Sequence, residues 1–156
     1  MKRWLGKTLK AARNRRGSAM LEFAIGSGVL VAAFAGTFQF GYTFPQYNNL
    51  ENAVARGARY ASLRTYDSIN PTPTDAFKTA VKNMVVYGSP TAGTSPVLPG
   101  LTVANVNVTP GPFTLGIPST MTVSISGYTI NSIFATTPLT NKPQVTYVYQ
   151  GIWKPI

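Results

Sequence analysis

The sequence lacks cysteine and histidine altogether and has little negative charge. Without cysteine the chain can form no disulfide and no thiolate metal site. Without histidine it has neither the commonest metal ligand nor the usual general base. The four acids, Glu22, Glu51, Asp67 and Asp75, are spread thinly, so no close carboxylate pair suggests glycosidase or two-metal chemistry. We therefore expect no catalytic residues, no metal, no cofactor and no small-molecule substrate, and the sequence does not indicate an enzyme.

Positive charge is concentrated at the N-terminus. Seven of the 14 Lys and Arg residues precede Gly17 with no acid among them, which leaves +3 of the formal charge of +10 to the rest of the chain. They are Lys2, Arg3, Lys7, Lys10, Arg13, Arg15 and Arg16. Clustered bases can bind nucleic acid by releasing counterions from phosphate, but this cluster directly precedes an apolar segment. Bases in that place are typical of the cytoplasmic flank of a membrane helix, so we expect a membrane partner and no nucleic acid.

A long apolar segment follows the basic residues. Residues 23–38 contain no charge, and Gln39 is the only strongly polar side chain before Phe44. As a helix, residues 18–44 are long enough to cross a hydrocarbon core of about 30 Å at about 1.5 Å per residue. Two interpretations are open. In the first, the segment is a secretory signal that is cleaved after Ala35, at an A-x-A pattern. In the second, the segment is retained as a membrane helix and only the basic leader before it is removed.

Glu22 lies at the start of this segment and separates the two interpretations. A carboxylate is costly in lipid, and an ordinary signal core has no reason to carry one. If the chain is cut between Gly17 and Ser18, the new α-amine is a positive charge one helical turn from Glu22. A simpler explanation is that Glu22 lies in the headgroup region, favoured by the helix N-terminus. That explanation does not account for Gly17 and Phe23 as well.

Two stretches of the sequence resemble those of a known family. RRG-SAMLEF resembles a type IV prepilin processing site, with a basic leader, Gly17 before the cleavage point, Ser18 after it, and then Glu22 and the aromatic Phe23. NLENAVARGARYASL, residues 49–63, resembles the segment after the membrane helix in TadE-like minor pilins (pseudopilins) of the tight-adherence (Tad/Flp) type IV pilus system. Gln39 is a departure, because this family often has an acid before the Phe-Gly pair.

The resemblance implies that a prepilin peptidase cleaves after Gly17 and that Ser18 becomes the N-terminus. Glu22 would then serve recognition or assembly with other major and minor pilins. The protein would be held in the bacterial inner membrane by one N-terminal helix, with its N-terminus cytoplasmic and its C-terminal domain outside, and would reach the cell surface where it enters a pilus. Its function would be pilus assembly and so surface adhesion. The alternative, a soluble secreted binding protein released by signal peptidase after Ala35, stays open.

Small residues recur at every fourth position of the apolar segment, at Ala24, Gly28, Ala32 and Gly36. Such a ridge lets membrane helices approach each other closely, as in GxxxG packing. Glycine is also common in membrane helices generally, which is a second explanation for the pattern. These four residues are therefore the predicted helix-packing face, with composition as the competing explanation.

Pro45 interrupts the regular helical hydrogen-bond pattern, so we expect a kink or break near residues 43–46. Beyond it, apolar residues at helical spacing predict an amphipathic extension to about residue 63. Its stripe is Leu50, Val54, Gly57, Ala58 and Ala61. Three arginines, Arg56, Arg59 and Arg64, fall largely off this stripe and are expected to form a solvated helix face.

The C-terminal part of the chain predicts a mixture of helix and strand. A short helix is expected over residues 75–87, capped by Thr74 or Asp75 and ended by Gly88. Alternating apolar residues predict strands over 101–108, 120–126 and 145–149, with a bulge at Ala104-Asn105. The sequences TPGPFTLGIPS and FATTPLTNKP between them are expected to be connections.

The predicted fold is α+β and pilin-like: a long N-terminal helix, transmembrane in one half and amphipathic in the other, packed on a small antiparallel sheet. One-sided alternation in the strands is typical of such a sheet with one solvated face. The predicted domains are a cleaved leader (residues 1–17), a transmembrane helix (18–44) and an exported α+β domain (45–156).

Overall fold

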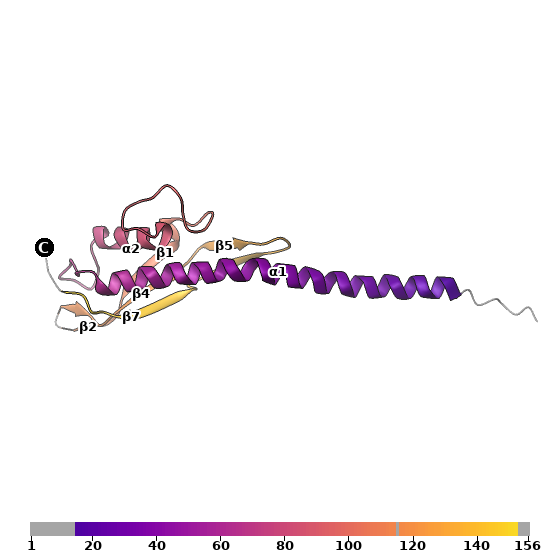
Figure 1. Cartoon of the computed structure of the whole chain (residues 1–156). Coiled ribbons are helices and arrows are strands. Elements are labelled where there is room, and N and C mark those ends of the chain that lie inside the picture. Colours follow the sequence, from indigo (N-terminus) through magenta and orange to yellow (C-terminus); the bar gives the residue numbers. More distant parts are fainter. Residues whose placement is uncertain (1–14, 115, 153–156) are drawn as a thin grey trace, which may run out of the picture. The chain divides into compact units, whose positions relative to one another are not determined.

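The structure is a computed structural model that describes residues 15–114 and 116–152. It divides into two compact units, Met1–Thr37 and Phe38–Ile156. In its described part, the first unit contains only the N-terminal portion of helix α1 (Arg15–Leu63), whereas the second contains the rest of α1 and the other elements labelled in Figure 1. Most of the predicted leader, residues 1–14, lies outside the described residues.

Helix α1 continues without interruption through Pro45, so of the kink or break predicted near residues 43–46 the break is wrong, and the kink stays a prediction. Proline removes one backbone hydrogen bond, but side-chain bonds support the neighbouring turns. The Thr43 hydroxyl donates to the Gln39 carbonyl at 2.8 Å, and the Gln46 amide donates to the Tyr42 carbonyl at 3.2 Å. Beyond Pro45 the helix is also held by its buried face. This tertiary support offsets the local cost of proline, and a local pattern cannot show it.

A three-stranded antiparallel sheet forms the centre of the second unit, in the order β1-β4-β7. The strands are β1 (Val106–Pro110), β4 (Thr120–Ile125) and β7 (Gln144–Val148). On the central strand, Met121, Val123 and Ile125 are fully buried. On the opposite face, the hydroxyls of Thr122 and Thr146 lie 2.8 Å apart in a cross-strand hydrogen bond. The predicted one-sided antiparallel sheet is confirmed.

The two sequences that were expected to be connections contain strands of two short hairpins, so that expectation is wrong. The hairpins are β2 (Phe113–Thr114) with β3 (Ile117–Pro118), and β5 (Tyr128–Asn131) with β6 (Thr136–Leu139). Both β2 and β3 lie in TPGPFTLGIPS, whereas β6 lies in FATTPLTNKP and pairs with β5, which precedes that sequence. The strand β6 shows why the pattern misses them: its sequence is Thr-Thr-Pro-Leu, and Leu139 alone of these four residues is buried. A strand that short and that exposed carries no alternation of apolar and polar residues.

The predicted bulge at Ala104-Asn105 is instead the 3-10 turn η1 (Val103–Asn105), which directly precedes β1. Asn105 stabilises it, because its side-chain oxygen accepts a hydrogen bond from the Thr102 N–H at 3.0 Å. The Asn105 amide also donates to the Gly127 carbonyl at 3.0 Å. The apparent slip in alternation is therefore a turn held by one polar side chain.

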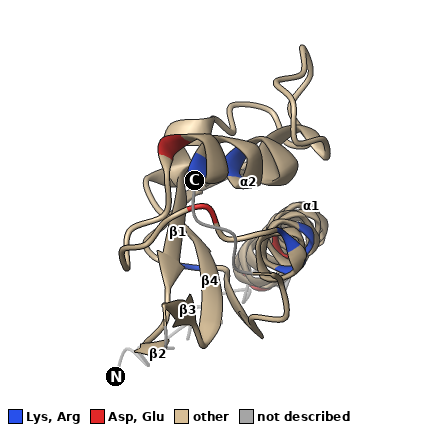
Figure 2. Ribbon diagram, turned by 90° about the vertical axis from the view of Figure 1, so that its left-hand side faces the viewer, with Lys and Arg blue, Asp and Glu red and all other residues tan. Residues whose placement is uncertain are grey.

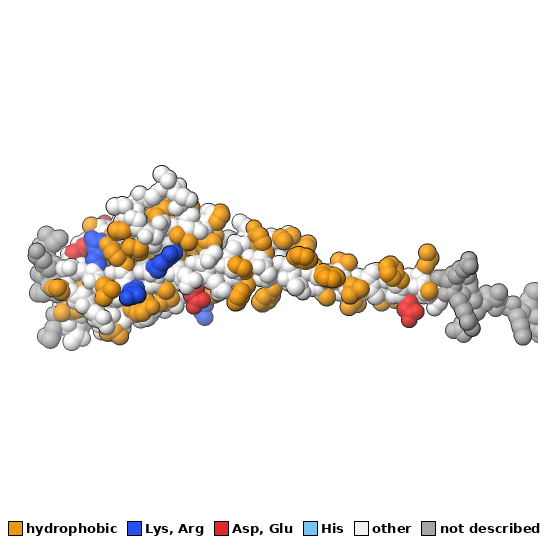
Figure 3. All heavy atoms as spheres, in the orientation of Figure 1, with side chains coloured by type: hydrophobic (Ala, Val, Ile, Leu, Met, Phe, Trp, Pro, Cys, Tyr) orange, Lys and Arg blue, Asp and Glu red, His pale blue; other side chains and the backbone are white. Residues whose placement is uncertain are grey.

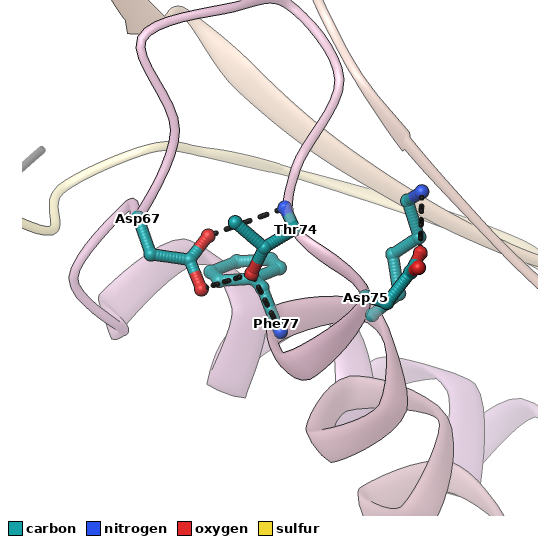
Figure 4. A network of polar contacts seen from close by, with 5 residues as sticks. Asp67, Thr74, Asp75 and Phe77 are labelled. Atoms are coloured by element: carbon teal, nitrogen blue, oxygen red, sulfur yellow. Dashed lines mark hydrogen bonds and ion pairs between the residues drawn. The ribbon is translucent and has the colours of Figure 1, made fainter. Parts of the chain in front are cut away.

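Helix α2 (Asp75–Tyr87) has the predicted ends. Thr74 is its N-cap and accepts a hydrogen bond from the Phe77 N–H at 3.2 Å, while Gly88 ends it in a left-handed conformation with φ 72°. Figure 4 shows a further contact that holds the cap in place. The Asp67 carboxylate accepts hydrogen bonds from the Thr74 N–H, at 3.3 Å, and from the Thr74 hydroxyl. The cap is thus tied to the chain that leaves α1.

One hydrophobic core joins α1, α2 and the sheet within the second unit. Figure 2 shows α1 and α2 as neighbours beside β1 and β4. From α1 the core receives Leu50, Ala53, Val54, Ala58 and Ala61, and from α2 it receives Phe77, Val81, Val85 and Val86. The predicted stripe of α1 is buried, so the amphipathic part of the helix covers the sheet as the fold class requires.

Aromatic rings close the core where α1 ends. Tyr66 is fully buried, and its ring centroid lies 5.7 Å from that of Phe77, 5.4 Å from that of Phe113 and 6.2 Å from that of Tyr149. The Tyr149 hydroxyl donates to the Arg64 carbonyl at 2.8 Å. These contacts fix the segment after β7 against the end of α1.

Candidate functional site

The apolar part of α1 is exposed along its length. No side chain of residues 17–44, all of which the structure describes, is buried. Large apolar residues there are strongly exposed, and Figure 3 shows them along the helix. Examples are Met20 at 77 %, Phe23 at 77 %, Val29 at 68 % and Phe40 at 75 %. An apolar surface of this extent marks a site that contacts lipid or protein.

The length and composition of this helix are sufficient to cross a membrane. Its apolar window has a mean hydropathy of 1.8, lies near the N-terminus and has none of its residues buried. A buried core helix of a soluble domain is therefore excluded as an explanation for this window. A cleaved signal sequence has the same composition, so the processing point has to come from other residues.

The four predicted processing residues lie at the start of the described helix. Gly17, Ser18, Glu22 and Phe23 are all exposed, and a Cβ placed on Gly17 would meet no atom within 4 Å. Glu22 forms no ion pair with any residue in the described ranges. The ion pair found in those ranges joins Lys78 and Asp75. The site is thus accessible, and its carboxylate is available to a partner. Cleavage after Gly17 stays a prediction.

The predicted packing face is equally accessible. Ala24, Gly28, Ala32 and Gly36 are exposed, and neither Gly28 nor Gly36 would bring a Cβ within 4 Å of another residue. Within the described residues, no contact requires a small residue at Gly28 or Gly36. Their role in helix packing stays a prediction that requires another helix.

A second surface feature, absent from the sequence-based predictions, lies within the folded unit where α1 meets the β5–β6 hairpin. It is an apolar groove of about 330 Å³, lined by α1 on one side and by the hairpin on the other. The lining residues are Gln39, Phe40, Thr43, Phe44, Tyr47, Ile130, Thr137 and Leu139. Gln39 connects the two sides, because its amide hydrogen-bonds to the backbone of Phe134 and Ala135. The sequence drew attention to Gln39 as an interruption of the apolar run and as a departure from the acid that the resembled family often has, but not as a contact to the hairpin.

Arg56 and Arg59 near the end of α1 and Arg64 just after it have two different environments. Arg56 and Arg59 are exposed, as expected for a solvated face. Arg64 is half-buried, and its guanidinium donates to the Tyr60 hydroxyl at 2.8 Å and lies 5.6 Å from the centroid of the Phe77 ring. Arg64 therefore belongs to the packing of the folded unit.

The described residues contain no group of three or more acidic, histidine or cysteine side chains arranged to hold a metal ion. The polar network at Asp67 and Thr74 holds the N-terminal cap of α2 and is accounted for structurally.

A family model described as TadE-like protein matches residues 17–59. Residues 17–59 form a TadE-like segment. The segment begins at Gly17, includes the whole exposed apolar stretch and ends at Arg59 within the amphipathic part of α1. It therefore contains the four predicted processing residues, the predicted packing face and Gln39. The basic residues before Gly17 lie outside the match. The match is consistent with a TadE-like, pilin-related protein. No curated protein and no solved structure matches the chain.

Proposed function

We propose that this chain is a minor pilin, or pseudopilin, that takes part in assembly of a Tad-type type IV pilus. The TadE-like segment indicates involvement in such a pilus. The observation that carries the finer proposal is that this segment joins an exposed apolar helix to a folded α+β unit without a break in α1. A subunit needs both parts: the helix for the membrane and the fibre, and the folded unit for the outside.

In this proposal a prepilin peptidase removes the leader after Gly17. Residues 18–44 then hold the protein in the bacterial inner membrane, with the N-terminus cytoplasmic because the basic residues precede the helix. The folded unit lies outside the cytoplasm. Other major and minor pilins bind the exposed helix, and the protein acts by assembly without catalysis. Surface adhesion follows from the pilus.

The second candidate is a soluble binding protein released after Ala35. The division of the structure gives it some support, because cleavage there leaves the unit Phe38–Ile156 intact. It also leaves several aromatic side chains in water, with Phe38 at 63 %, Phe40 at 75 % and Phe44 at 57 % exposure. Such a surface disfavours a soluble monomer. The TadE-like segment, moreover, runs across Ala35 without interruption.

The function is tested by deleting the gene for this chain in its source bacterium. Cells without it are expected to carry few or no surface pili and to attach poorly, and the wild-type chain is expected to restore both properties. Pili are counted by electron microscopy, and attachment is measured by retention of cells on a surface. Normal pilus numbers and normal attachment in the deleted strain would show that the chain has another function.

A further inference from the structure

The tip of the β5–β6 hairpin is apolar and exposed. It consists of residues 132–135, in which Ile133 is 58 % and Phe134 63 % exposed. No charged residue occurs anywhere from Asn83 to Asn141, so the tip has no charged neighbour in the sequence on either side. Two large apolar residues at the end of an uncharged loop are costly in water and suited to an apolar environment.

Gln39 hydrogen-bonds to two backbone groups of this tip. Its side-chain oxygen accepts a hydrogen bond from the Phe134 N–H at 3.1 Å, and its side-chain nitrogen donates to the Ala135 carbonyl at 3.3 Å. The Ser132 N–H also donates to the Ala135 carbonyl, and the Ser132 and Thr43 hydroxyls bond to each other. Backbone groups can enter an apolar medium only when they are paired in this way.

These contacts place the tip beside the end of the apolar segment. Gln39 follows directly on the charge-free residues 23–38 in a continuous helix. At about 1.5 Å per residue, roughly 25 Å of helix separates Gln39 from Glu22, close to the thickness of a hydrocarbon core of about 30 Å. With Glu22 at one boundary of the hydrocarbon, Gln39 and the hairpin tip lie at the other.

We propose that Ile133 and Phe134 insert into the outer surface of the membrane, between the lipid headgroups and the acyl chains, as a second anchor beside the helix. This inference rests on the membrane-spanning role proposed above for residues 18–44. It also gives a reason for glutamine at position 39. A carboxylate there could not donate to the Ala135 carbonyl and would add a charge at the edge of the hydrocarbon.

The insertion is tested with the full chain in vesicles of phosphatidylethanolamine and phosphatidylglycerol. Because the chain has no cysteine, single substitutions Phe134→Cys, Phe34→Cys and Ala92→Cys each accept one environment-sensitive fluorophore. Phe34 lies within the apolar segment, and Ala92 is an exposed residue of the loop after α2. Quenching by nitroxide-labelled lipid and by aqueous iodide is measured for each label.

The label at position 134 is expected to resemble the label at position 34 and to differ severalfold from the label at position 92. It should be quenched by nitroxide near the headgroups and protected from iodide. Accessibility to iodide at position 134 equal to that at position 92 overturns the proposal. Protection from both quenchers also overturns it, because the tip is then covered by protein. If the label at position 34 is not quenched by lipid, the membrane-spanning role itself fails, which is a separate result.

A matched pair of glutamines tests the part played by Gln39. Gln39→Ala removes both bonds to the tip, whereas Gln46→Ala removes only a bond within α1, from Gln46 to the Tyr42 carbonyl. With the label at position 134, Gln39→Ala is expected to reduce lipid quenching severalfold and Gln46→Ala to leave it unchanged. Equal quenching in both variants would show that Gln39 does not hold the tip in the membrane.

Discussion

Gly57 of α1 lies so close to Val85 of α2 that a Cβ on Gly57 would be 2.2 Å from Val85 Cγ2. Both residues are buried, and Val85 is a β-branched residue with little rotameric freedom in a helix. The two helices can pack at this distance because position 57 has no side chain. Gly57 is within the TadE-like segment, so the segment contributes to the packing of the folded unit as well as to the exposed helix.

Gly57→Ala is therefore expected to destabilise the protein. Alanine gains up to about 1 kcal/mol of helix propensity over glycine, but overpacking a core costs about 1–3 kcal/mol. We expect a net loss of about 1 kcal/mol, measured by urea unfolding in detergent. Gly41→Ala is the matched control, because a Cβ there meets no atom within 4 Å and only the propensity gain applies. Equal stabilisation by the two substitutions would contradict the close packing.

The first turns of the folded unit support the hairpin, so fragments that begin at different residues should differ. A fragment starting at Phe38 keeps the bonds of Gln39 and Thr43 to residues 132–135, and one starting at Gln46 loses them. Both are expected to fold, because the core residues of α1 begin at Leu50. Hydrogen exchange at the hairpin tip should be much faster in the shorter fragment. Equal protection of the tip in the two fragments would mean that the hairpin is stable without α1.

Alkaline pH is expected to destabilise the folded unit. Burial, with smaller effects of Asp67 and Tyr149, raises the pKa of Tyr66 from 10.0 to about 12. Burial also raises the pKa of Tyr128 and of Tyr149. The unfolded chain then loses these protons at lower pH than the folded chain, so this stability is fully present below about pH 10 and is lost as the pH rises toward the folded pKa values.

The measurement is the urea midpoint as a function of pH, followed together with tyrosinate absorbance. Tyr66→Phe should lower the midpoint at neutral pH, because the Tyr66 hydroxyl donates to the Asn70 carbonyl at 3.0 Å. The same substitution should make the decline between about pH 10 and 12 less steep. A midpoint that does not change over this range in the wild type would contradict the buried environment of the three tyrosines.

Features that depend on neighbouring residues could be predicted from the sequence. Helix α2 is the clearest case, because Thr74, Gly88 and the apolar spacing between them all act locally. The central strand β4 was predictable for the same reason, since Met121, Val123 and Ile125 alternate with polar residues. The exposed apolar helix also follows from composition.

Features that depend on distant residues could not be predicted. The hydrogen bonds between Gln39 and the hairpin join residues about 95 positions apart, and no local sequence pattern predicts them. Asp67 holds Thr74, the N-cap residue of α2, from outside the helix, and Pro45 is tolerated because of tertiary packing. The processing site differs from these features, because its predicted role does not depend on the fold of the chain. Its residues, Gly17, Ser18, Glu22 and Phe23, are exposed in the part of the chain that the structure describes, so the fold by itself does not test their predicted role in processing.

Glu22 is expected to act in association with other subunits, by pairing with an N-terminal amine once the leader is removed. An unpaired charge at the edge of lipid is costly, and a partner amine offsets much of that cost. Glu22→Gln removes the charge and keeps the size, so cleavage should survive while crosslinking to partner pilins in membranes falls. Glu22→Asp should retain part of the crosslinking. Glu51→Gln, an exposed acid farther along α1, is the control. Wild-type crosslinking by cleaved Glu22→Gln would show that Glu22 is only an interfacial acid.

The central claim is that the apolar helix is retained and only the basic leader is removed. Intact-mass measurement and N-terminal sequencing of the protein from its own membranes test this most directly. The account predicts a mature chain that begins at Ser18, and a Gly17→Val variant that keeps its leader because a Cβ beside the scissile bond blocks cleavage. A mature chain that begins at Gly36 and is released from the membrane would contradict the account.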